Sequence, residues 1–70
     1  METLDVRGLS CPIPVLKTKK LMDAGVTEIL VLGSSAVSRE NVQRLAHSQG
    51  YQATVKASSE TGWEMELKKR

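Results

Sequence analysis

Six short apolar-patterned segments, separated by breaks that contain glycine or serine, set the strongest limit on how this 70-residue chain can fold. In chain order they span residues 2–6, 12–24, 27–32, 35–49, 51–57 and 63–68. The four short segments alternate apolar and polar residues or run continuously apolar, which is typical of strands. The two long segments contain good helix formers and each ends before a glycine, which indicates helices. The predicted order is therefore β-α-β-α-β-β.

This order predicts an α+β fold, a two-layer α/β sandwich in which a four-stranded mixed sheet carries both helices on one face. A chain of this length has room for a single domain, residues 1–70. The alternating and continuous apolar runs predict the core residues, which are Leu4, Val6, Ile29, Val31, Leu45, Val55 and Met65.

Two segments carry more detailed expectations. The first long segment lacks one clean apolar stripe, because Ile13 and Leu16 lie on one side and Val15 and Met22 on the other. The segment 51–57 has one face predicted to hold Tyr51, Ala53, Val55 and Ala57. We expect residues 58–62 to form a hairpin turn, and we expect Tyr51 and Trp63 to pack at the edge of the core.

Composition excludes several classes of site. One cysteine and one histidine cannot supply an internal disulfide or the three or four protein ligands of a zinc site, so we expect no metal. No apolar run approaches the roughly 20 residues of a membrane span, and a lone cysteine fits a reducing cytoplasm. The net charge of +2 is too weak to indicate a nucleic-acid partner.

The candidate reactive site is the stretch Gly8-Leu9-Ser10-Cys11-Pro12-Ile13-Pro14. It reads as a tight turn that leads into a helix, with Pro12 suited to the first helical position. Cys11 is then predicted at or beside the N-cap, where the helix dipole favours a thiolate. Gly8 is expected to serve the turn, and Asp5 to bond its backbone.

A single exposed thiolate limits the available reactions. With no second cysteine there is no dithiol redox chemistry, and no histidine lies near Cys11 in sequence to suggest a Cys–His hydrolase. One activated cysteine can accept and donate an atom or group, and a persulfide is the expected cargo. Arg7 and Lys17 could add positive potential, while Lys17, Lys19 and Lys20 form either a solvated face or a docking site for an acidic partner.

Residues 4–20, LDVRGLSCPIPVLKTKK, resemble the signature of the TusA/SirA-like sulfur-carrier family, with its Cys-Pro-x-Pro motif. Residues 38–46, followed by Gly50-Tyr51, are similar to the YedF-type subgroup, which is linked by name to selenium metabolism. The residues that fall at the family's spacing are Asp5, Gly8, Cys11, Pro12 and Pro14.

The resemblance implies the same two-layer sandwich and a sulfur carrier, which would be a sulfurtransferase if it acts as an enzyme. We expect a cytoplasmic protein that works without a cofactor. Cys11 would carry sulfur as a persulfide from a cysteine desulfurase or rhodanese to an acceptor sulfur-relay protein. Acceptors in the family serve tRNA thiolation, molybdenum-cofactor assembly or sulfur oxidation. Arg7, Lys17, Lys19 and Lys20 would be candidates for docking these partners, with no membrane or direct nucleic-acid contact.

One departure from the family pattern keeps other functions open. Many relatives have an acidic, Asp-containing pair where this chain has Ser34-Ser35. This favours, as an alternative, a non-catalytic regulatory or protein-interaction module on the same fold. A small RNA-binding domain is a third possibility. The net charge of +2 argues against it, and so does the presence of only one Tyr and one Trp on which bases could stack.

Overall fold

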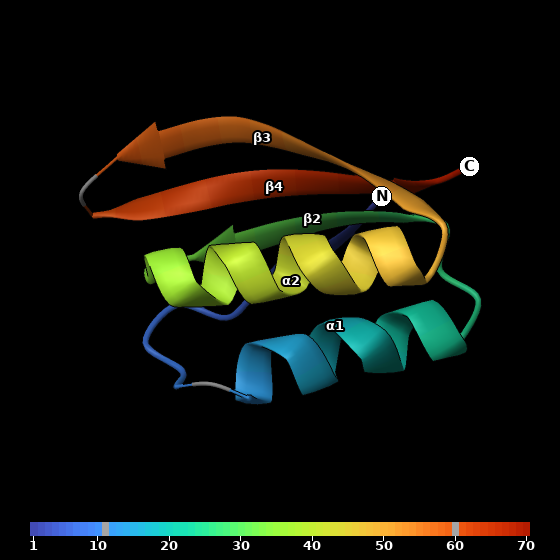
Figure 1. Ribbon diagram of the computed structural model, residues 1–70, viewed down its shortest axis with the longest axis horizontal. Helices are drawn as coiled ribbons and strands as arrows, with labels where there is room; N and C mark the ends of the chain where they lie inside the picture. The colour runs from blue at the N-terminus through green and yellow to red at the C-terminus, as the bar shows by residue number, and fades with distance from the viewer. Residues whose placement is uncertain (11, 60) are drawn as a thin grey trace.

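The computed structural model describes residues 1–10, 12–59 and 61–70, and these follow the predicted order of strands and helices (Figure 1). The elements are β1 (Glu2–Asp5), α1 (Ile13–Asp23), β2 (Glu28–Gly33), α2 (Ala36–Ser48), β3 (Tyr51–Ser59) and β4 (Gly62–Lys69). Each helix is one residue shorter at each end than the sequence predicts. The predicted α+β class and element order are confirmed.

The strands form one mixed sheet in the order β1-β2-β4-β3. β1 and β2 are parallel, with Leu4 opposite Val31, and β4 is antiparallel to both of its neighbours, β2 and β3. Both helices lie on the same side of the sheet, as predicted, and both begin at the end where β1 and β2 finish (Figure 1). Within the described ranges, no helix lies over the other face of the sheet.

The core lies between the helices and the covered face of the sheet. Alternate residues of β2 and β4 point into it, because side chains along a strand alternate between its two faces. The buried apolar residues are Val6, Met22, Ile29, Val31, Val42, Ala46, Tyr51, Trp63, Met65 and Leu67. Of the predicted core, four residues are buried, and Leu4 and Leu45 are partly buried against it.

Helix α1 buries a face that hydropathy alone does not reveal. Pro14, Thr18 and Met22 pack inward, whereas Leu16 is 59% exposed. The Thr18 hydroxyl donates a hydrogen bond of 2.8 Å to the carbonyl of Pro14, so burial leaves this polar group satisfied. The mixed stripe in the sequence therefore reflects a helix that keeps aliphatic side chains on its outer surface.

Strand β3 differs from the prediction at its far end. The expected core residue Val55 is 41% exposed, because β3 is an edge strand and this part of it lies far from the helices. A register shift between Val55 and Ala57 places Ala57 opposite Glu64, so these two β3 residues do not share a face as predicted. The strand also continues to Ser59, which pairs with Gly62, so the turn is tighter than residues 58–62.

Polar caps and side chains fix the remaining ends. Ser35 caps α2 by accepting a 3.4 Å hydrogen bond from the Ser38 backbone N–H. The Tyr51 hydroxyl donates to the carbonyl of Val26, and both Tyr51 and Trp63 are more deeply buried than core-edge residues would be.

Among the described residues, no helix combines the length and apolar character needed to cross a membrane.

Candidate functional site

One end of the molecule gathers the residues of the sequence motif. Because β1 and β2 are parallel, the segments that follow them leave the sheet at the same edge. The first segment, of which residues 6–10 and 12 are described, precedes α1, and the second, residues 34–35, leads into α2 (Figure 1). The described residues therefore bring the motif beside a serine pair that lies more than 20 residues away in sequence.

Asp5 shapes the start of the first segment. Its Oδ1 accepts hydrogen bonds of 3.0 Å from both the backbone N–H and the Nε of Arg7, and its Oδ2 accepts one of 2.9 Å from Nη2. The side-chain hydrogen bond from Arg7, followed by the backbone one, lowers the pKa of Asp5 from its usual 3.8 to about 2. Asp5 thus bonds the turn backbone as expected, and Arg7 is held in an ion pair.

Gly8 and Ser34 connect the two segments. Gly8 has a φ of 77°, in the left-handed region that favours glycine, which supports its predicted turn role. Its backbone N–H donates a 3.1 Å hydrogen bond to the Ser34 hydroxyl, and the Leu9 N–H donates to the Val6 carbonyl at 3.2 Å. Sequence reasoning noted Ser34 as a helix-cap candidate and as a departure from a family pattern, and it did not predict this contact with Gly8.

Backbone hydrogen bonds from the first turn of α1 reach back to the motif. The Ile13 N–H donates to the Ser10 carbonyl at 3.0 Å, and the Leu16 N–H donates to the Pro12 carbonyl at 3.1 Å. Pro12 is the N-cap and has no side-chain cap hydrogen bond, so the prediction that it is the first helical residue is off by one position. Pro14 is the second residue of the helix. Cys11 itself lies outside the described residues.

The segment after β2 is held from the sheet. The indole Nε1–H of Trp63 donates a 2.7 Å hydrogen bond to the Ser35 carbonyl, and the indole ring occupies the space where Gly33 lacks a side chain. A Cβ atom on Gly33 would lie 2.1 Å from Cζ2 of Trp63. Trp63 therefore positions the serine pair, and through Ser34 it supports the turn at Gly8.

The predicted docking lysines do not act alike. Lys19 forms a 2.9 Å ion pair with Asp23, one helical turn away. Lys17 and Lys20 are exposed and form no ion pair with any described residue. Their positive charge is therefore available to a partner, and whether they dock one stays a prediction.

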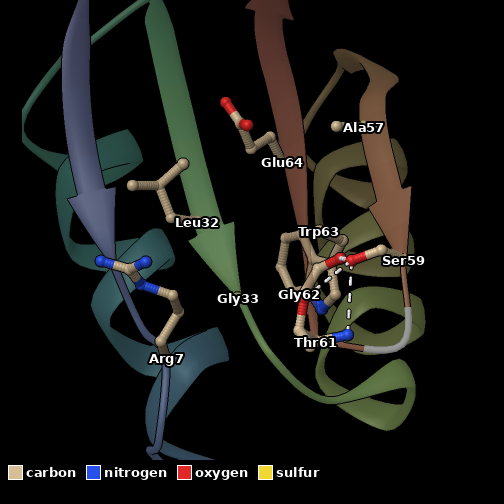
Figure 2. Close-up of a pocket in the computed structure, with 9 residues that line it drawn as sticks. All are labelled: Arg7, Leu32, Gly33, Ala57, Ser59, Thr61, Gly62, Trp63 and Glu64. Atoms are coloured by element: carbon tan, nitrogen blue, oxygen red, sulfur yellow. Dashed lines mark hydrogen bonds between the residues drawn. The ribbon is translucent and has the colours of Figure 1, made fainter.

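A shallow depression of about 320 Å³ lies near the same end of the sheet (Figure 2). It is lined by residues that include Arg7, Leu32, Glu64 and Thr61. Leu32 and Glu64 are opposite each other in the ladder and share the face that no helix covers. Within the described residues, no group of three or more histidine or carboxylate side chains is arranged to hold a metal ion.

Comparison with known proteins gives a consistent result. Residues 2–69 match the family model described as sulfurtransferase TusA. A candidate sulfur carrier protein of Methanocaldococcus jannaschii is 37% identical over an alignment of length 71, which covers 99% of this chain and 95% of that protein. Another, from Halobacterium salinarum, is 46% identical over 41 residues, 53% of this chain and 51% of the relative.

Among solved structures, the crystal structure of a SirA-like protein from Desulfitobacterium hafniense superposes with a TM-score of 0.83 at 34% identity, covering 97% of this chain and 96% of that one. The shared fold includes the two-helix layer and the mixed sheet described above. The YedF-type subgroup stays a prediction. Since the family model spans almost the whole chain and a full-length relative exceeds 30% identity, the chain belongs to the sulfurtransferase TusA family.

Proposed function

We propose that this protein is a sulfur carrier that accepts sulfur as a persulfide on Cys11 and passes it to an acceptor protein. The observation that carries the proposal is the position in sequence of the chain's one cysteine, in a member of the TusA family. It lies between Ser10 and Pro12, both of which are exposed and lead directly into α1. The donor would be a cysteine desulfurase or a rhodanese.

The surrounding contacts support a preorganised site. Gly8 is tied to Ser34, Arg7 is tied to Asp5, and Ser10 accepts from the first N–H of α1. These contacts hold the segment on both sides of the cysteine in sequence. Because the Ile13 N–H is already used and Pro14 has none, the helix start offers few donors to a phosphate and suits a smaller anion better.

The proposed transfer needs no external oxidant. The Cys11 thiolate attacks the outer sulfur of a persulfide on the donor, so that a new S–S bond forms on Cys11. The donor's own S–S bond breaks, and its electron pair stays on the donor cysteine as a thiolate. An acceptor thiolate then attacks the outer sulfur of the Cys11 persulfide and regenerates the Cys11 thiolate.

Intact-protein mass spectrometry tests this directly. After incubation with a cysteine desulfurase and cysteine, the protein should gain the mass of one sulfur atom, and a reductant should remove it. The Cys11→Ser variant is the matched control and should gain nothing, because the chain has no other thiol. If a panel of desulfurases and rhodaneses leaves the folded parent unmodified, the carrier proposal fails and the protein-interaction module becomes the better interpretation.

A further inference from the structure

A groove runs between the outer surfaces of α1 and α2, and one end of it adjoins the sulfur site in sequence. Its volume is about 500 Å³. The four α2 residues that line it lie at the i, i+3, i+4 and i+7 spacing of one helical stripe, and the other two lie three residues apart at the start of α1. The lining residues are Pro12, Val15, Asn41, Arg44, Leu45 and Ser48. Because Pro12 directly follows Cys11, a segment bound in this groove would contact the residue next to the proposed persulfide site.

The groove is apolar on the α1 side and continues onto exposed aliphatic surface. Val15 and Leu16 lie three and four residues after Pro12, so each is a neighbour of Pro12 on the surface at the start of α1, with Val15 in the groove and Leu16 beside it. Leu16 is 59% exposed, and Val15 and Leu45 are only partly buried. An apolar surface of this kind is stabilised when an apolar side chain of a partner covers it and displaces water.

The charge carried by the helical layer has one dominant sign. Helices α1 and α2 are described in full and carry five basic and two acidic residues, whereas the strands carry five acidic and three basic ones. One of the two helical acids, Asp23, is already paired with Lys19. Lys17, Lys20 and Arg44 form no ion pair with any described residue. The helical layer is therefore a basic surface with an apolar groove in it.

We infer that this groove docks an acidic surface segment of the protein that exchanges sulfur with Cys11, with one apolar side chain of that segment in the groove. The inference rests on the proposed function and names the partner's chemistry. Charge complementarity selects an acidic partner, and the apolar lining selects a protein segment over a nucleic-acid backbone. Arg44 and the α2 side of the groove are the parts that the sequence did not indicate.

Charge reversal tests the inference. Arg44→Glu should slow the loading of Cys11 by a desulfurase about three- to tenfold at low salt and subsaturating donor, because an exposed charge at the rim of an interface acts mainly on encounter. Leu16→Ser should slow loading about threefold without changing charge. The matched control is Lys69→Glu, which makes the same charge change on an exposed residue of β4, beyond the start of β2 and so at the end of the sheet opposite the motif.

A second measurement separates docking from thiol chemistry. The rate of Cys11 alkylation by iodoacetamide should be the same in the parent, Arg44→Glu and Lys69→Glu. The inference is overturned if Arg44→Glu and Leu16→Ser load as fast as the control, or if alkylation falls in step with loading. In the first case the carrier function stands and only the groove loses its role.

Direct binding covers the case in which no sulfur is transferred. NMR titration of the ¹⁵N-labelled protein with the same desulfurase should shift the amide signals of Val15 and Leu45, whether or not sulfur moves. Unshifted signals there would refute the groove, and shifts without loading would refute the carrier function alone. Two other results would also overturn the inference: low-salt binding of bulk tRNA that depends on Arg44, and self-association that Leu16→Ser abolishes.

Discussion

Replacing Gly33 by alanine tests the contact that positions the serine pair at the end of β2. The added Cβ would lie 2.1 to 2.7 Å from three atoms of the Trp63 indole, whereas real contacts of this kind stay above 3.0 Å. The indole is 5% exposed and donates its N–H to the Ser35 carbonyl, so it cannot move away freely. We expect overpacking to cost about 1–3 kcal/mol and the lost hydrogen bond a further 0.5–1.5 kcal/mol or so.

The free energy of unfolding should therefore fall by about 2–4 kcal/mol, measured by urea denaturation followed by circular dichroism. Gly25→Ala is the matched control, because its φ of 91° adds left-handed strain but no atom lies within 4 Å of the new Cβ. It should cost about 1–2 kcal/mol. In a Trp63→Leu background the cost of Gly33→Ala should shrink by at least about 1 kcal/mol. An unchanged cost in that background would refute the steric argument.

Three further predictions concern the motif. Ser34→Ala should remove the acceptor for the Gly8 N–H and lower the free energy of unfolding by about 0.5–1.5 kcal/mol. Ser34→Asp should keep the acceptor, and its negative charge should slow alkylation of Cys11 at neutral pH. Equal alkylation rates in the parent and Ser34→Asp would contradict this effect of charge. Pro14→Ala should destabilise by about 1–2 kcal/mol in thermal unfolding because the ring is fully buried, and an unchanged melting temperature would refute this. Since the Asp5 pKa is lowered to about 2, its pairing with Arg7 stabilises the fold above about pH 4 and is lost as pH falls toward 2; Asp5→Asn should flatten that part of the stability curve, and identical curves would show that the pair contributes nothing.

The order of elements and the single helical layer could be predicted because both follow from local patterns. The continuous run of β2 and the alternation in β4 indicate which residues face the helices, and the structure buries Ile29, Val31, Met65 and Leu67 as that logic requires. Val55 could not be predicted in the same way. Its exposure depends on the edge position of β3 and on an extra residue in the strand. Neither feature changes the alternation of apolar and polar residues in the sequence.

The candidate site was only partly predictable for a related reason. Asp5, Gly8 and the two prolines act through neighbours in sequence, so their turn and helix-start roles can be read locally. The burial of Pro14 could not be predicted in this way, because it depends on what packs against the helix. The contact of Ser34 with Gly8 spans 26 residues and needs the parallel pairing of β1 with β2 to form.

That contact also gives a physical meaning to the departure from the usual acidic pair. A serine hydroxyl and a carboxylate oxygen can both accept a hydrogen bond from the Gly8 N–H, so either residue can tie the two segments together. Only the carboxylate would add a negative charge to the segment that contacts the turn three residues before Cys11. A nearby negative charge disfavours both a thiolate and a persulfide anion. With Ser34, this chain keeps the structural link and omits the opposing charge, which favours a reactive cysteine over a purely structural one and weakens the departure as support for a non-catalytic module.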